Sequence, residues 1–503
     1  MKMGLPENKF SLKRVLRHRI NAVVAVAVIA VVLIILVLIK GDGTFFSEAL
    51  STMCVNLRGV VTIFCYICLL FLLFLICSKY GNIRLGGENA TKEYSTFSWL
   101  SCLFMAGCGI GIVFYCQEPI LHMHSNPYSG NVPGSSSAVA YSLTLFNWTI
   151  NAWGQYGVLG VIISYFYFNR RMSLKLSSVL PAKVPSWAKR VVDILMALGI
   201  IAGLTTSLGL GVSQIESGFS YVFNQDISPY ILMILISIVA AWSVTSGLKR
   251  GVKWLSNLSF VLVGILLVFV VLVATFRLDV SGFLKYIADG TWLLFRNFLS
   301  YNDFYNHASD QWAASYPIFF DLWFAAWAAF VAVFVAKISR GRTIREFIIG
   351  VVGIPTLFTI IWFGIFGRVG LEFKNLLYDT MSSDITTSLF IFLRQLAPNS
   401  GYVFLSTLVL LIICMFFITS SDSGSFVVAT LLSDKAEVEA KERMFWAVIQ
   451  CLVAMTLFAC GGLALVQSVS VIMGIIVMGL ILLGCFFFIR TLLKDTASKR
   501  NIQ

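Results

Sequence analysis

Aromatic side chains recur on two strongly apolar stretches, NWTINAWGQY at 147–156 and FFDLWFAAW at 319–327. The face of an aromatic ring attracts a cation, and this contact is worth about 2 kcal/mol or more where water is excluded. A quaternary ammonium group, which donates no hydrogen bond, is the kind of cation that such faces hold. Packing would also place aromatic residues at helical spacing, so the pattern alone leaves both interpretations open. The candidate residues are Trp148, Trp153, Tyr156, Trp323, Phe324 and Trp327.

Glycines occupy alternate positions in MAGCGIGIVFY, residues 105–115, as Gly107, Gly109 and Gly111. Each glycine in a helix interior costs about 1 kcal/mol relative to alanine. The glycines permit a break in the helix, and the break would free backbone groups to bind an ion and a ligand. A small-residue face for close helix packing is the alternative.

The elements that position these residues are expected to cross a membrane. The chain has 503 residues, of which 58% are hydrophobic and 12% are charged, whereas soluble domains carry about 25% charged residues. An apolar run of about 20 residues spans a hydrocarbon core about 30 Å thick. The sequence therefore predicts an all-α polytopic membrane protein. Its twelve spans are expected near 20–40, 57–77, 97–119, 138–168, 188–216, 228–246, 253–276, 317–339, 345–368, 402–431, 442–464 and 468–490.

The net charge of +13 comes from basic residues that fall in alternate loops of this twelve-span arrangement. This is the positive-inside pattern, and it predicts that both termini are cytoplasmic. It also argues against nucleic acid as a partner and for the lipid bilayer. We expect an N-terminal cytoplasmic arm at 1–19, one transmembrane domain at 20–490 and a short cytoplasmic C-terminal tail at 491–503.

Enzyme motifs such as Walker A, HExxH and GxSxG with triad partners do not occur in the sequence. We therefore expect no enzymatic activity and no cofactor, and a secondary transporter or a channel is favoured. Cys65 and Cys68 are interpreted as helix packing residues. His122 and His124 are expected in a solvated external loop, and Glu118 is expected to cap an outer vestibule.

Four motifs resemble those of one family, the betaine/choline/carnitine transporters. They are GCGIGIVFYCQEP at 107–119, KRGVKWLSNLSF at 249–260, KISRGRTIREF at 337–347 and FFITSSDSGSF at 416–426. The resemblance extends from about residue 20 to 490. It implies the fold of the sodium-coupled amino acid transporters, in which two extra helices precede two inverted five-helix repeats, here helices 3–7 and 8–12. It also implies alternating access, a place in the bacterial cell membrane and, for many members, a homotrimer.

The resemblance further assigns roles to individual residues. The six aromatic residues would enclose a trimethylammonium head, and the backbone at Gly107, Gly109 and Gly111 would meet the rest of the substrate. The hydroxyls of Thr419 and Ser420 would bind a coupling ion, expected to be sodium. The remaining sodium ligands would be the carbonyls of Met105, Cys108 and Phe416. Hydrogen bonding of Thr419 and Ser420 to their own helix is the alternative.

The sequence also departs from the family pattern. The family usually has tryptophan where this chain has Asp321 and Phe324, and histidine where it has Asn147. An ionisable residue at membrane depth is a candidate functional residue, so Asp321 is included among the substrate-binding residues. It could face a substrate ammonium, relay a proton or be hydrated at the external surface.

The function expected from all of these features is import of glycine betaine, choline or carnitine by cation symport. A sodium-independent substrate:product exchanger is one alternative. In exchangers of the family an arginine stands where this chain has Ser259, which argues against exchange. Taurine, ectoine or a sulfonium compound remains an alternative substrate.

Overall fold

The computed structural model describes residues 12–39, 43–107, 109–125, 135–246, 253–278, 282–302, 312, 314–433 and 438–500. Over these residues the chain is helical, and the described part contains no strand beyond one isolated bridge between Arg84 and Thr343. Seven of the described helices are long and apolar enough to cross a membrane. The all-α polytopic fold predicted from the apolar runs is confirmed.

Each predicted span corresponds to a helix or a pair of helices. The chain begins with α1 (Leu12–Ile39) and α2 (Gly43–Cys77). The first set of five then comprises α3 (Thr96–Gly107) with α4 (Gly111–Phe114), α6 (Ser136–Trp148) with α7 (Ile150–Phe168), α8 (Ser186–Phe223), α9 (Pro229–Ser246) and α10 (Lys253–Arg277).

The second set follows the connecting helix α11 (Phe283–Asn302). It comprises α13 (Phe319–Ile338), α14 (Ile344–Ile348) with α15 (Ile354–Gly370), α18 (Ser400–Leu432) and the two halves of α19 (Ala440–Arg500). The halves of α19 meet at a kink, where Gly461 and Gly462 have non-helical backbone angles. Because each set has an odd number of spans, the second set enters the membrane from the side opposite to the first. The two sets are therefore inverted.

Two predicted spans are interrupted. The span predicted at 97–119 is broken between Gly107 and Gly111, as its glycines suggested. The span predicted at 138–168 is broken at Thr149, whose φ of −112° and ψ of −114° are not helical. This second break was not predicted, and it separates Trp148 on α6 from Tyr156 on α7. Helical spacing therefore does not relate these two residues.

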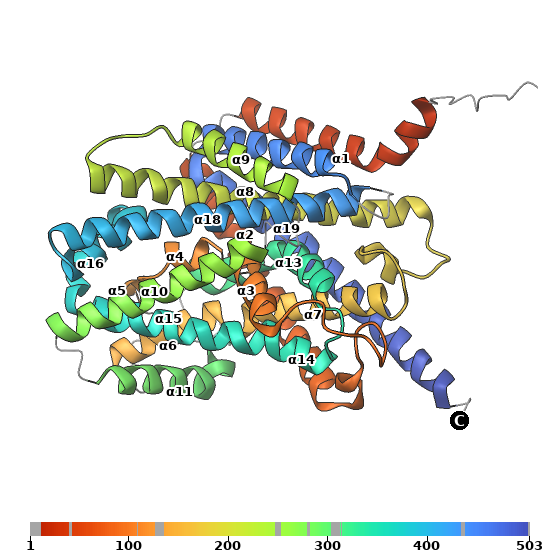
Figure 1. Ribbon diagram of the computed structural model, residues 1–503, viewed down its shortest axis with the longest axis horizontal. Coiled ribbons are helices and arrows are strands. Elements are labelled where there is room, and N and C mark those ends of the chain that lie inside the picture. Colours follow the sequence, from red (N-terminus) through yellow and green to blue (C-terminus); the bar gives the residue numbers. More distant parts are fainter. Residues whose placement is uncertain are drawn as a thin grey trace, which may run out of the picture.

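Helix α13 lies within the bundle, near the centre of Figure 1, and packs against α7, α8 and α19. Every residue from Phe319 to Ala336 is buried, as expected for a helix that is apolar on all sides. Figure 1 shows α11 along one outer side of the molecule. Its exposed apolar residues include Leu284, Trp292 and Leu299. A central helix can position side chains against several neighbours at once.

The C-terminal end of α13 is fixed by backbone hydrogen bonds to the segment that follows α2. The amide of Leu85 donates to the carbonyl of Arg342 at 2.8 Å, and the amide of Gly341 donates to the carbonyl of Leu85 at 2.9 Å. Thr343 and Glu346 form a capping box that begins α14. The Arg342 guanidinium lies 3.9 Å from the centroid of the Trp99 ring. Burial lowers the pKa of this guanidinium, and the Glu346 carboxylate opposes that shift.

Candidate substrate-binding site

A small cavity lies where the interrupted third span meets α6, α7 and α13. It has room for about one water-sized sphere, less than a trimethylammonium group needs. Its walls are all residues that were singled out from the sequence. They are Gly107, Gly111, Trp148, Tyr156, Trp323, Phe324 and Trp327. The structure thus brings together seven of the ten predicted substrate-binding residues.

The aromatic walls of the cavity meet mainly edge to face. The ring centroids of Trp148 and Trp323 are 6.2 Å apart with an interplanar angle of 86°, and those of Trp148 and Phe324 are 5.6 Å apart at 90°. Trp323 and Trp327 are 6.4 Å apart at 84°. Such T-shaped pairs suit the ring quadrupoles. All of these side chains are at most 5% exposed, so a cation in the cavity would meet π faces from which water is largely excluded.

The glycine break allows the backbone to lie directly against these rings. A Cβ atom added to Gly111 would lie 2.9 Å from the Trp323 ring and 3.0 Å from the Trp148 ring. Gly109 has φ +48°, in the left-handed region that side chains with a Cβ atom avoid. The interpretation of the glycines as a helix break holds, and close packing is a second reason for glycine at position 111.

Two predicted wall residues lie outside the lining of the cavity. The Trp153 ring contacts Gly107, where an added Cβ would be 2.5 Å away, and its centroid is 5.4 Å from that of Tyr156. Trp153 therefore supports Tyr156 from behind. Gly109 does not line the cavity either, but its backbone turns the chain between Gly107 and Gly111.

Asp321 also lies outside the cavity lining. Its side chain is 5% exposed and has the Cys65 thiol of α2 as its hydrogen-bond partner. The backbone carbonyl of Asp321 accepts a hydrogen bond from Gln155 Nε2 at 3.0 Å. The carboxylate thus points to α2. It neither lines the cavity nor lies hydrated at the external surface.

The predicted ion ligands lie where the broken third span meets α18. Met105 is buried in the last turn of α3, and Phe416 and Thr419 are buried in α18. A Cβ atom on Gly109 would be 3.9 Å from Ser420 Oγ. Cys108, the remaining predicted ligand, lies outside the described residues.

The two hydroxyls of this region differ in their hydrogen bonds. Thr419 Oγ1 donates within α18, to the carbonyl oxygens of Met415 and Phe416, each at 3.0 Å. Thr419 therefore fits the alternative interpretation, in which the hydroxyl hydrogen-bonds to its own helix. Ser420 Oγ is buried and has no hydrogen-bond partner among the described residues. Of the two, Ser420 has the hydroxyl that is free to bind a ligand.

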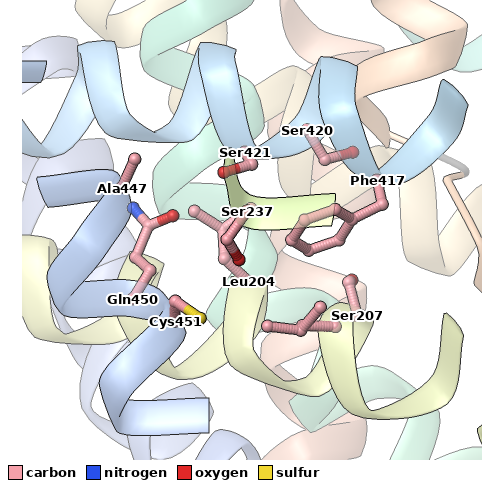
Figure 2. A pocket seen from close by; sticks show the side chains of 10 residues that line it. Leu204, Ser207, Ser237, Phe417, Ser420, Ser421, Ala447, Gln450 and Cys451 are labelled. Atoms are coloured by element: carbon pink, nitrogen blue, oxygen red, sulfur yellow. The ribbon is translucent and has the colours of Figure 1, made fainter. Parts of the chain in front are cut away.

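Ser420 also borders a second cavity, which lies between α8, α9, α18 and α19 (Figure 2). This cavity likewise has room for about one water-sized sphere. In Figure 2 the Gln450 side chain extends from α19 toward Ser421 and Ser237. The polar residues that line it are Ser207, Ser237, Ser420, Ser421 and Gln450. Ser420 therefore borders a cavity with several polar lining residues.

A buried polar network behind the aromatic cavity was missed by sequence reasoning. Glu118 Oε2 accepts a hydrogen bond from Trp148 Nε1 at 2.6 Å. Glu118 Oε1 accepts one from Asn147 Nδ2 at 2.7 Å and is 2.8 Å from His122 Nε2.

The prediction of a solvated loop is wrong for His122, which is 0% exposed. Residues 118–125 form the helix α5, which places Glu118 and His122 on one face. Their i, i+4 spacing was the available sequence signal.

A helical membrane bundle with an enclosed, water-poor cavity at a broken helix is the architecture of a secondary transporter. Comparison with known proteins identifies the kind of transporter. The family described as BCCT, betaine/carnitine/choline family transporter, matches residues 19–497. The chain therefore belongs to the BCCT family. It is a polytopic transporter of the cell membrane and not an enzyme.

Individual relatives are similar over most of the chain. A glycine betaine transporter of Acinetobacter baylyi is 34% identical over 457 residues, covering 86% of this chain and 67% of the relative. The glycine betaine transporter OpuD of Bacillus subtilis is 34% identical over 417 residues, covering 80% of each chain. A glycine betaine/proline/choline/ectoine transporter of Vibrio parahaemolyticus is 32% identical, covering 86% of this chain and 79% of the relative.

One solved structure, of a Na+-coupled sialic acid symporter, aligns with 86% of this chain and 86% of its own at 14% identity and a TM-score of 0.47. The family membership does not depend on this likeness.

Proposed function

We propose that this protein imports a quaternary ammonium compound of the glycine betaine type by symport with sodium. The observation that carries the proposal is the convergence of five aromatic side chains from α6, α7 and α13 on one buried cavity. Once the rings move apart, such walls suit a methylated ammonium head, which needs no hydrogen-bond acceptor and gains from contact with π faces.

The relatives support the substrate class. Two of them are named as glycine betaine transporters, and a third is named for glycine betaine, proline, choline and ectoine. Their names leave choline and ectoine as competitors to glycine betaine for this chain. Carnitine, taurine and sulfonium compounds belong in the same test.

The proposal of sodium coupling is supported by the position of Ser420. Its unbonded hydroxyl lies beside Gly109, at a helix break, and a break of this kind can free backbone carbonyls to bind an ion. A few oxygen ligands without a carboxylate suit a monovalent cation. The burial of the site supports alternating access, because the rings must separate before a substrate can enter. Cytoplasmic termini and a homotrimer are part of the same proposal.

Purified protein reconstituted in liposomes tests the function. Uptake of labelled glycine betaine, choline and carnitine is measured with and without an inward sodium gradient, with ectoine and taurine as unlabelled competitors. We expect sodium-dependent accumulation of at least one quaternary ammonium compound. Accumulation only against a preloaded internal substrate would instead establish exchange, and competition by taurine alone would change the substrate class.

Two serine variants test the ion site. Ser420→Ala removes the free hydroxyl, and we expect the sodium concentration for half-maximal uptake to rise about tenfold, or about 1.4 kcal/mol. Ser425→Ala is the matched control, because Ser425 is a buried serine of the same helix outside the predicted ion ligands. Equal sodium dependence in both variants would remove Ser420 from the ion site.

A further inference from the structure

The carboxylate of Glu118 is one hydrogen bond away from the aromatic cavity. The Trp148 indole lines the cavity with its ring and donates its N–H to Glu118 Oε2 on its outer edge. The Glu118 side chain is 0% exposed. The carboxylate therefore lies behind a cavity wall and does not itself line the cavity.

Hydrogen bonds reach both oxygens of the carboxylate. Trp148 Nε1 donates to Oε2 at 2.6 Å and Asn147 Nδ2 donates to Oε1 at 2.7 Å, while His122 Nε2 lies 2.8 Å from Oε1. An ionised carboxylate only accepts hydrogen bonds, and charge-assisted bonds of this length offset part of its desolvation. Among the described residues, no lysine or arginine forms a salt bridge with Glu118, and His122 would compensate its charge only in the protonated form.

Aromatic rings also lie beside the network. The His122 ring contacts Tyr316 at a centroid distance of 4.6 Å and Trp312 at 5.7 Å. Tyr115 lies near Glu118 and contacts the Trp148 ring at 5.8 Å. In such low-dielectric surroundings a negative charge acts over longer distances than it does in water. The Trp148 indole links this carboxylate to the aromatic cavity that its ring lines.

We infer that Glu118 determines specificity, by making the cavity select a cationic head group over a neutral one of the same shape. Two effects act together. The charge itself attracts a cation across the width of the indole, and an N–H that donates to a carboxylate polarises the ring toward a more negative face. The inference rests on the proposed function, since it concerns the head group that the cavity holds.

The arrangement also explains how such a site can release its substrate. A carboxylate inside the cavity would form a direct ion pair with the head group and would need water to leave it. A carboxylate behind an indole contributes attraction without that contact. Transport requires binding that is favourable and still reversible.

The test compares a cation with its neutral isostere. Choline and 3,3-dimethylbutan-1-ol have the same shape, but a carbon replaces the charged nitrogen in the second compound. Each is used as a competitor of labelled glycine betaine uptake in proteoliposomes, and the ratio of the two inhibition constants is measured. Glu118→Gln keeps the side-chain shape and removes the charge. We expect the preference for choline over the neutral alcohol to fall about tenfold.

A merely structural role of Glu118 would change both inhibition constants by the same factor and leave their ratio unchanged. Glu118→Asp keeps the charge, and we expect it to retain most of the preference. Asp193→Asn is the matched control, because Asp193 is also a buried carboxylate but is bonded to Ser177, outside the cavity. We expect this variant to keep the wild-type ratio.

The outcomes separate the two proposals. Wild-type protein on which no quaternary ammonium compound acts as substrate or competitor would overturn the proposed function and the inference with it. An active wild type and an unchanged ratio in Glu118→Gln would overturn the inference alone. If Glu118→Gln fails to fold, Trp148→Phe is measured in its place, since it keeps an aromatic ring and removes the hydrogen bond to the carboxylate. An unchanged ratio in that variant would also overturn the inference.

Discussion

The two ends of α13 are held by different kinds of contact. Near its N-terminus, Trp323, Phe324 and Trp327 meet other rings around a cavity, and the indole N–H groups of Trp323 and Trp327 have no hydrogen-bond partner among the described residues. At its C-terminus, the loop around Arg342 is tied by backbone hydrogen bonds to Leu85. The N-terminal end is adaptable, because ring contacts are weakly directional. The C-terminal end has a single arrangement, because hydrogen bonds between backbone groups fix it.

This difference separates what identifies the family from what forms its site. The motif KISRGRTIREF supports the resemblance strongly, but its basic loop lies outside the aromatic cavity. The loop fixes where α13 ends, and the helix then carries its aromatic residues into the centre of the bundle. A motif can thus identify the family although its own residues stabilise the fold and do not line the binding site.

The largest effect is expected at the cavity end. Trp327→Leu removes one π face from a buried wall, and loss of about 2 kcal/mol of cation–π attraction predicts a fall in uptake of about 30-fold or more at low substrate concentration. Initial rates of glycine betaine uptake in proteoliposomes measure the change.

Trp446→Leu is the matched control, since Trp446 is a buried tryptophan of α19 outside the cavity lining. We expect this variant to keep the wild-type KM. Unchanged substrate affinity in a folded Trp327→Leu protein would remove Trp327 from the site and weaken the contrast between the two ends.

A smaller effect on uptake, together with a cost in stability, is expected at the loop end. Arg342→Ala removes the guanidinium stacked on Trp99 and its hydrogen bond to the carbonyl of Tyr94 at 3.3 Å. The predicted cost is about 2 kcal/mol of stability, with KM within about twofold of wild type. Thermal denaturation in detergent measures the first quantity, and uptake by the folded fraction measures the second.

Arg368→Ala provides the comparison for the loop. Arg368 pairs with Glu372 at 2.6 Å near the end of α15, and a partly exposed i, i+4 ion pair contributes about 0.3 to 1 kcal/mol. We expect little change in its denaturation temperature. A raised KM in Arg342→Ala with normal stability would show that the loop takes part in the site.

The sequence predicts the helices well because long apolar runs have few alternatives in a membrane. It predicts the set of aromatic residues, but not which of them line the cavity. Trp148 and Trp153 were treated as members of one helix, and the break at Thr149 rotates one relative to the other. The role of Trp153 behind Tyr156 therefore could not be read from spacing.

The Glu118 network was hidden for a related reason. Polar residues that follow a span normally lie in water, and His122 was assigned to a loop on that basis. Only the folding of α5 against α6 brings His122 and Asn147 to the same carboxylate. Contacts between elements that are distant along the chain determine such networks, and neither composition nor periodicity contains them.

The smallest effect is expected for Asp321→Asn, although Asp321 lies only two residues before Trp323 of the adaptable end. Its carboxylate points to Cys65 on α2, away from the cavity. An asparagine side chain retains an acceptor for the thiol. We expect the ratio of choline to glycine betaine uptake to change by less than about twofold, measured in the same proteoliposomes as Glu118→Gln.

The pair of variants makes this last prediction informative, because both replace a buried carboxyl group by an amide. Glu118 is bonded to a residue that lines the cavity, whereas Asp321 is bonded to a neighbouring helix on its other side. If proximity to the cavity wall decides selectivity, only the Glu118 variant changes the preference for cations. A change of tenfold in Asp321→Asn would mean that charge reaches the substrate through α13 itself, and the N-terminal end of this helix would then act electrostatically as well as through its rings.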